Sequence, residues 1–153
     1  MRWYAEAPGG AGLALPEEAV WEWQHDAQLL SDDRLLLSSG VLGEDGPGPG
    51  GPRIEHTAVY EYEIDIEGGA LSLVWEHHSE PEWVSNYKGG AWRLAGGNTT
   101  HYFGDFGGFK EITPDGQIAW QLRFVTEDSP WIGRSTFIDD LYSMAEGASK
   151  AEK

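Results

Sequence analysis

Cysteine is absent from this sequence of 153 residues, and basic residues are few. The first absence excludes disulfides, thiolate metal sites and cysteine nucleophiles, and it leaves the redox compartment open because proteins of either compartment can lack cysteine. Ten Lys and Arg stand against 26 Asp and Glu, which gives a formal charge of −16. Nucleic acid and anionic membrane surfaces are therefore disfavoured as partners, since binding either one requires a basic footprint.

Long apolar runs are also missing. No stretch approaches the roughly 18 apolar residues of a membrane span. The start, Met1–Glu6, leads into Pro8 without an apolar segment of signal length. We therefore expect no membrane span and no signal peptide in this chain, and the compartment stays undetermined. With 40 % hydrophobic residues and eight Trp, there is enough apolar surface for the core of one ordinary domain.

Gly and Pro divide the chain into short apolar runs, and helical periodicity is not found over residues 21–124. Strand alternation is found instead, most clearly in Ala58–Ile64. Successive side chains of a strand point to opposite faces of the sheet. The pattern therefore predicts a strand whose buried face carries Tyr60, Tyr62 and Ile64.

A shift of 64 residues lays Ala27–Arg34 over Ala91–Asn98. After each of these segments the sequence shows a strand, a Gly-rich connection, a second strand, a tight turn and a strand containing Trp, namely Trp75 or Trp120. Each unit therefore reads as four antiparallel strands. In the first unit the connection is the Gly- and Pro-rich segment Ser39–Pro52, which we expect to be a mobile surface loop.

Tandem four-stranded meanders are typical of β-propeller blades. The sequence therefore predicts an all-β fold, an incomplete β-propeller with about two four-stranded antiparallel blades over residues 21–80 and 85–130 and a partial third. In this interpretation the partial propeller spans 21–142, residues 1–20 are an irregular N-terminal segment, and 143–153 are a flexible tail. A self-contained β-sandwich is the alternative.

His25 is the first candidate for chemistry, because a neutral imidazole can act as a nucleophile, a base or a metal ligand. It follows Trp21 and Trp23, at the predicted crossing between two units. In a propeller such crossings place side chains at the mouth of the central channel. Asp26 is adjacent and should point to the opposite face of a strand, so it is not expected to orient the imidazole. A histidine that is hydrogen-bonded to a neighbouring carbonyl is the structural alternative.

The other histidines do not form a recognisable metal pattern. His77 and His78 should diverge because adjacent strand positions face opposite ways, His56 borders the predicted loop, and His101 lies inside a strand. No spacing is that of a zinc site. We expect no bound metal.

Four segments together resemble the arylsulfotransferase (aryl-sulfate sulfotransferase) family, with a similarity that runs from about Trp21 to Tyr142. The segments are Trp23–Leu30, Val59–Asp65, Leu94–Thr99 and Lys110–Trp120. The resemblance implies a six-bladed propeller that moves a sulfuryl group from an aryl sulfate to a phenol through a transiently sulfated histidine, with no nucleotide sulfate donor and no cofactor. By position, His25 resembles that nucleophile.

The sequence also departs from the family pattern. The family uses a His-x-Asn motif and an arginine from blades that precede its nucleophile, and nothing upstream of Trp21 supplies either. Arg134 fits a recurrent arginine near the family's C-terminal end, where its guanidinium could bind substrate sulfate or serve a structural role. The resemblance therefore implies the C-terminal portion of such an enzyme, inactive alone. A truncated gene model, one piece of a split protein and a short self-associating homologue remain as explanations.

The expected partners are small-molecule phenols and aryl sulfates, together with the missing blades, in another chain or by self-association. Many members of the family are exported. The alternative function is a non-catalytic propeller fragment for binding or scaffolding, in which Trp92, Trp120 and Trp131 dock a protein or glycan. A third possibility is a non-functional fragment, whose open blade edges would show as aggregation.

Overall fold

The computed structural model describes residues 5–6, 12–17, 21–43, 54–126, 131–133 and 135. Strands form all the extended elements of this part of the chain, which confirms the predicted all-β class. They are β1 (Ala5–Glu6), β2 (Leu13–Ala14), β3 (Trp23–Ser31), β4 (Arg34–Leu42), β5 (Ile54–Asp65), β6 (Ala70–His78), β7 (Gly89–Arg93), β8 (Thr99–Phe103), β9 (Gly108–Ile112) and β10 (Ile118–Arg123).

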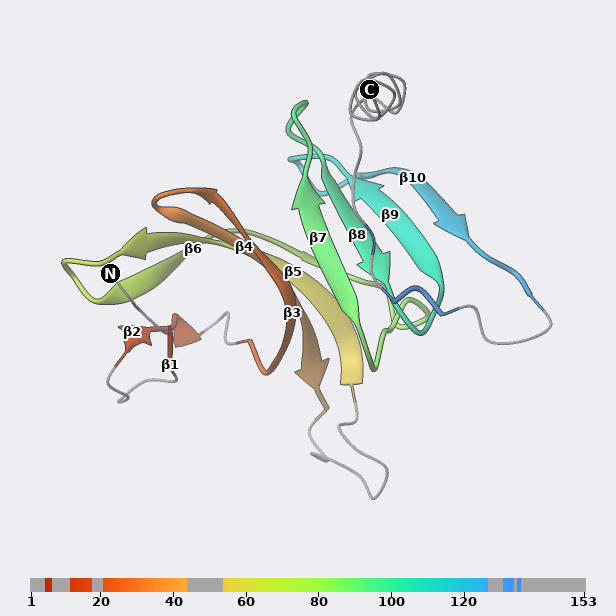
Figure 1. The fold of residues 1–153 in the computed structure, drawn as a ribbon, viewed down its shortest axis with the longest axis horizontal. Helices are drawn as coiled ribbons and strands as arrows, with labels where there is room; N and C mark the ends of the chain where they lie inside the picture. The colour runs from red at the N-terminus through yellow and green to blue at the C-terminus, as the bar shows by residue number, and fades with distance from the viewer. Residues whose placement is uncertain are drawn as a thin grey trace, which may run out of the picture.

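These strands form two sheets. The first sheet is mixed, has the strand order β1-β2-β6-β5-β4-β3 and curls strongly (Figure 1). The second sheet is antiparallel and has the strand order β10-β9-β8-β7. Strands β3 to β6 form one antiparallel meander, and β7 to β10 form another. Each half of the predicted repeat therefore holds four consecutive antiparallel strands. Strands β1 and β2 add parallel pairing to the β6 edge, where only irregular structure was expected.

Both faces of β5 in the first sheet are buried. Tyr60, Tyr62 and Ile64 of β5 are 3 %, 0 % and 6 % exposed, as the alternation predicts. Val59, on the opposite face, is also fully buried. It packs there with Leu36 and Ala91, in the core between the two sheets.

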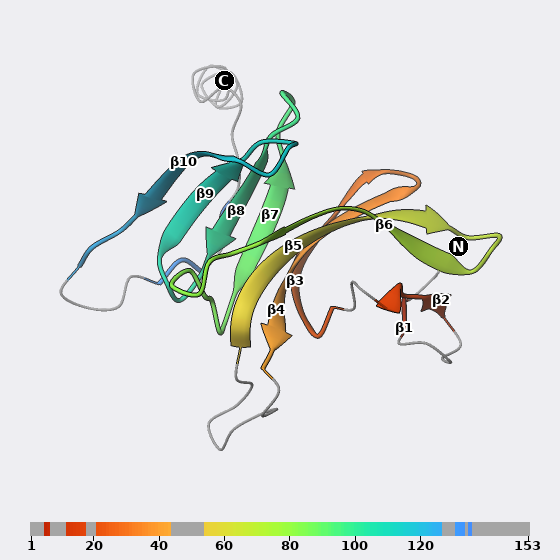
Figure 2. The same cartoon turned by 180° about the vertical axis from the view of Figure 1, so that it is seen from behind.

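The two faces of β5 therefore belong to two cores. On the face of β5 that carries Tyr60 and Tyr62, the core also contains Leu13, which lies in the short strand β2, and Leu15, which directly follows β2. On the other face the second sheet approaches, with β7 packed against β3 and β4 (Figure 2). The first strands of the two meanders thus lie side by side.

Strand β4 is longer than predicted. Leu42 pairs with Ile54, so pairing continues through residues 39–42, where a loop was expected. Ser39 stabilises this extension because its hydroxyl oxygen accepts hydrogen bonds from the backbone N–H groups of Glu22 and Trp23, at 3.2 and 3.3 Å. The rest of the predicted loop, residues 44–52, lies outside the described residues.

Candidate functional site

A pocket of about 350 Å³ lies where the two meanders meet. It is lined by His25, Asp26, Lys88, Gly89, Tyr102 and Gly133. The first two residues come from β3, Gly89 from the start of β7, Lys88 from the loop directly before it, and Tyr102 from β8. Titratable side chains that are far apart in the sequence therefore converge on one cavity.

A β-bulge determines how His25 and Asp26 enter this pocket. His25 pairs with Ser38 and Gln28 pairs with Leu36, so β3 carries one more residue here than β4. Asp26 takes up the extra residue with a φ of 48°. A bulge breaks the alternation of a strand. The two adjacent side chains therefore line the same pocket, which corrects the expectation that they would face opposite ways, and His25 lies within β3 rather than at a crossing between units.

Asp26 is connected to the second sheet through Tyr102, whose hydroxyl donates a hydrogen bond of 3.2 Å to Asp26 Oδ2. Gly90 of β7 leaves the space for this contact. A Cβ atom at Gly90 would lie 2.6 Å from Asp26 Oδ2 and still closer to the ring of Tyr102. The contact between Asp26 and Tyr102 therefore requires a glycine at position 90.

Gly90→Ala tests this packing. Because the methyl group would overlap both Asp26 and Tyr102, we expect it to lower the free energy of unfolding by about 2 kcal/mol, in the range measured for overpacked sites. The measurement is urea unfolding. Gly96→Ala is the matched control, since a Cβ there meets nothing within 4 Å, and equal effects of the two substitutions would contradict the prediction.

His25 is held mainly in its neutral form. Partial burial lowers the pKa of its imidazole, although the carboxylates of Asp105 and Asp26 oppose the shift. Its Nε2 atom is buried and has no hydrogen-bond partner among the described residues. The imidazole therefore keeps one buried nitrogen without a hydrogen bond to a described protein group; a free lone pair is one requirement of a nucleophile or base, and access to the substrate is another.

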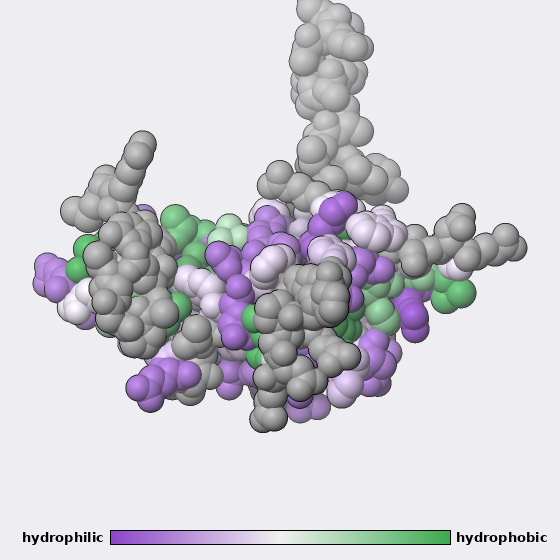
Figure 3. Space-filling view, turned by 90° about the horizontal axis from the view of Figure 1, so that it is seen from below, coloured by the Kyte–Doolittle hydropathy of each residue, from purple (hydrophilic) through white to green (hydrophobic). Residues whose placement is uncertain are grey.

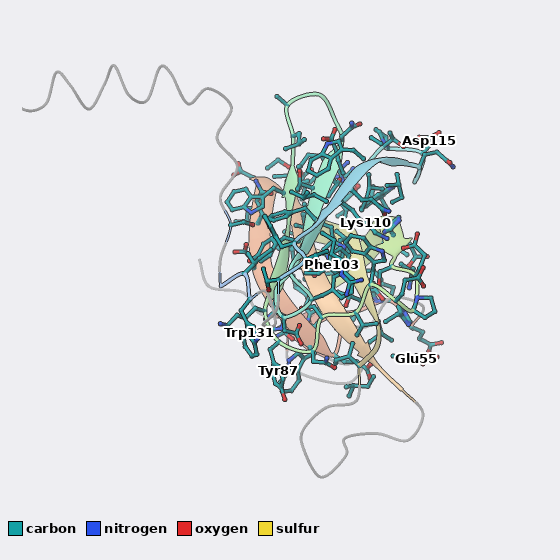
Figure 4. The ribbon with its side chains drawn as sticks, turned by 90° about the vertical axis from the view of Figure 1, so that its right-hand side faces the viewer. Glu55, Tyr87, Phe103, Lys110, Asp115 and Trp131 are labelled. Atoms are coloured by element: carbon teal, nitrogen blue, oxygen red, sulfur yellow. The ribbon has the colours of Figure 1, made fainter. Side chains whose placement is uncertain are left out.

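Lys88 brings positive charge to the pocket on a tightly held loop. Asp105 Oδ1 accepts a hydrogen bond of 2.5 Å from Ser85 Oγ, and Oδ2 accepts one of 3.2 Å from the backbone N–H of Asn86. Lys88 itself has a φ of 63°. Its Nζ lies 5.2 Å from the ring centre of Trp131, a cation–π contact on the side of the molecule where Figure 4 shows Tyr87 and Trp131. Sequence reasoning missed Lys88 because no motif surrounds it.

The remaining candidates fall into two groups. Arg134 lies outside the described residues, so its contact with sulfate stays a prediction. Trp92 and Trp120 lie on β7 and β10, the two outer strands of the second sheet. Trp120 and Trp131 are 46 % and 58 % exposed, while Trp92 is half-buried. The expectation that these tryptophans dock a partner stays a prediction.

A second titratable cluster is buried between the sheets. Lys110 is fully buried, forms an ion pair with Glu80, and places Nζ 4.4 Å from the ring centre of Trp83. Figure 4 shows Lys110 close to Phe103, away from Asp115 and Glu55. His101 is also fully buried, and its Nε2 lies 3.1 Å from Ser38 Oγ. None of these residues lines the pocket that contains His25.

His77 and His78 diverge, as predicted. His77 pairs with Val59, whose face packs on the second sheet, and His78 pairs with Ala58, which lies in the other core. In the described ranges, no three His, Asp or Glu side chains are arranged to hold a metal ion.

The surface in Figure 3 mixes hydrophilic residues with smaller separated hydrophobic patches. No described helix has the length and apolar character to cross a membrane.

The fold and the site define an all-β protein with a histidine-containing polar pocket between two antiparallel meanders. Comparison with family models, curated proteins and solved structures finds no match.

Proposed function

We propose that the chain is an arylsulfotransferase-like protein, an incomplete β-propeller in which His25 carries a sulfuryl group between phenolic compounds. The observation that carries this proposal is that His25 and Lys88 line one pocket, so a histidine whose pKa is lowered and a basic residue border the same space. A transferable sulfuryl group needs both, a nucleophile for its sulfur and a cation for its oxygens.

The arrangement of the strands supports the propeller. In a propeller, each blade is a four-stranded sheet and the blades surround a central channel. Here β3 and β7 are the first strands of their meanders and lie together, and the pocket opens beside them. We propose that the meanders are two neighbouring blades, with a partial third, and that the pocket belongs to the channel.

The proposed reaction has two steps. A lone pair of the His25 imidazole attacks the sulfur of an aryl sulfate, the bond from sulfur to the aryl oxygen breaks, and a phenolate leaves. The sulfated ring then carries a positive charge, which Asp105 and Asp26 stabilise as they do for the protonated ring. A second phenol attacks the same sulfur, gives up its proton to solvent, and restores neutral His25.

Lys88 has a supporting role in this scheme. Its ammonium group would neutralise the sulfuryl oxygens, on which negative charge accumulates during transfer. Its position depends on the loop held by Asp105, which ties Ser85 and Asn86 in place. No cofactor enters the scheme, and the substrates are small phenols and aryl sulfates.

The test is transfer from 4-nitrophenyl sulfate to phenol, with phenyl sulfate measured as the product. The resemblance implies that further blades are needed, so the assay uses this chain alone and the chain extended by the blades that the family places before it. We expect turnover in the extended protein, its loss in His25→Ala, and a gain of about 80 Da on the His25 peptide after aryl sulfate is added alone.

Gln24→Ala is the matched control, because Gln24 is the exposed neighbour of His25 on the same strand. This variant should keep full turnover. Unchanged turnover in His25→Ala, or an extended protein that turns over without any sulfated His25, would refute the proposal.

A non-catalytic binding role is the second candidate. The exposure of Trp120 and Trp131, 46 % and 58 %, supports it, since exposed aromatic side chains are common anchors at interfaces. The two functions are distinguished by the same assay: the binding role gives a retained complex and no sulfated product.

A further inference from the structure

We propose that His56 and His78 form a binding site for a divalent transition-metal ion of the Zn²⁺ type, separate from the His25 pocket. Nε2 of His56 lies 2.8 Å from Nδ1 of His78. Two nitrogens bound to one tetrahedral zinc at its usual bond lengths lie about 3.3 Å apart. The separation of the two nitrogens would therefore have to increase by about half an ångström, and each ring would have to turn so that its lone pair points at the ion beside the line between them.

Pairing of β5 with β6 brings these residues together, although 22 positions separate them in the sequence. His78 lies opposite Ala58, and His56 precedes Ala58 by two residues on β5, on the same face. Diagonal neighbours on adjacent strands are within reach of long side chains. The ring centres of His56 and His78 are 4.9 Å apart, so both imidazoles are already positioned by the sheet.

Glu76 supplies the support that metal-binding histidines usually have. Its Oε2 lies 2.9 Å from Nε2 of His78, on the nitrogen that does not face His56. In the neutral cluster His78 donates its Nε2 proton to Glu76, which leaves a lone pair on Nδ1. A carboxylate in this position fixes the tautomer and makes the ligating nitrogen more basic.

Metal binding then requires one change of tautomer. When both rings are neutral and Glu76 accepts the Nε2 proton of His78, the proton between the rings is donated by Nε2 of His56 to Nδ1 of His78. On binding, that proton moves through solvent to Nδ1 of His56, and both facing nitrogens can coordinate the ion. Starting from neutral rings, the exchange releases no net proton.

The surroundings favour a cation that is open to solvent. Glu55 and Glu76 place negative charge beside the two rings. The side chain of His78 is 43 % exposed, so water can complete the coordination. Tyr60 packs edge-on against His78, and its phenol stays protonated because burial, Glu76 and Glu22 raise its pKa to about 12. The site therefore offers two imidazoles and open positions, which suits Zn²⁺ rather than Ca²⁺ or Mg²⁺.

The experiment is a Zn²⁺ titration of the tag-free protein, followed by calorimetry and by the ¹⁵N signals of the histidine rings. We expect one Zn²⁺ per chain and no binding of Mg²⁺. The ring signals of His56 and His78 should shift, while those of His77 and His101 stay in place. His56→Ala and His78→Ala should each weaken binding at least about tenfold, and Glu76→Gln should weaken it by a similar factor through loss of the supporting carboxylate.

His77→Gln is the matched control, because His77 is adjacent to His78 and faces the other side of the sheet. It should bind Zn²⁺ as the parent does. Absence of binding, equal weakening in His77→Gln, or ring signals that shift elsewhere would each overturn the proposal. The ring signals come from the unsubstituted protein, so the result does not depend on whether a variant folds.

Discussion

Glu80→Leu is expected to lower the free energy of unfolding by about 2 kcal/mol, because it leaves the ammonium group of Lys110 buried without its carboxylate. Lys110 is fully buried, and Glu80 is its only ion-pair partner in the described part of the chain. The side chain of Glu80 is 48 % exposed, so we expect a smaller loss than the 3 to 5 kcal/mol or so that follows when a fully buried pair is broken.

A double-mutant cycle separates this electrostatic cost from lost packing. Lys110→Met keeps an unbranched chain against Trp83 and Phe103 and removes the buried charge. We expect this variant to lie within about 1 kcal/mol of the parent, since hydrophobic replacements of buried ions are often neutral. In the Lys110→Met background, Glu80→Leu should then cost almost nothing.

Urea unfolding of the four proteins gives the coupling free energy directly. If Glu80→Leu costs as much beside methionine as beside lysine, the cost comes from packing and the prediction is wrong. The pKa of Glu80 offers a second measurement. Partial burial is the largest single influence and tends to raise it, but the hydrogen bond and charge of Lys110, a backbone hydrogen bond and the charge of His77 together outweigh burial, and the pKa lies below its usual value. Lys110→Met should raise it.

The strands of the two meanders could be predicted in large part because their patterns are local, whereas β1 and β2 were not predicted. Alternation in β5 identifies Tyr60, Tyr62 and Ile64 as one buried face. The burial of Val59 could not be predicted in the same way, because it depends on contact with β7 of the second sheet. Local patterns specify which residues share a face, and the packing of sheets decides which faces are covered.

The candidate site was predictable only in part. His25 is recognisable from its sequence context, but the bulge that turns Asp26 into the same pocket has no signal in the sequence, because an extra residue in a strand is visible only in its pairing with β4. Lys88 could not be found either, since its place depends on hydrogen bonds from residues of the 85–88 loop to Asp105.

The burial of the charged side chain of Lys110 is a further feature that could not be predicted from the sequence. Within β9, Lys110 shares a face with Ile112, and Phe109 shares the other face with Glu111, so each face carries one apolar and one charged residue and the pattern does not indicate which face is buried. The face of Lys110 is the buried one, because it packs against the first sheet and Glu80 and Trp83 enclose the ammonium group. Cross-sheet partners of this kind are far apart in the sequence and belong to no motif.

The unfolding free energy should also fall steeply as the pH drops from about 6.5, because His101 cannot accept a proton in the folded state. Burial, together with the charges of His77 and Lys110, lowers the pKa of His101 from 6.5 to about 3. Below pH 6.5 the unfolded chain binds a proton at this residue and the folded chain does not. The stability contributed by neutral His101 is therefore complete above pH 6.5 and declines as the pH falls towards 3, reaching a loss of about 2 kcal/mol at pH 5.

His101→Gln isolates this contribution. Glutamine can keep the hydrogen bond with Ser38 and does not titrate, so the variant should lose about 1.2 kcal/mol less than the parent between pH 6 and 5. Other histidines with lowered pKa values, such as His25 and His56, act in the same direction but remain in both proteins. Carboxylates with lowered pKa values, such as Glu80, lose their contribution only at lower pH. Parallel stability curves for the parent and the variant would contradict the prediction.

Lys110→Met provides an independent check of the same mechanism. Removing the ammonium group takes away one of the two charges that repel a proton on His101, so the pKa of His101 should rise and the decline in stability should end at a higher pH. Burial is the largest cause of the shift and is unchanged in this variant, so most of the decline should remain. The buried lysine and the buried histidine are therefore coupled: the charge that Glu80 stabilises is also one that keeps His101 neutral.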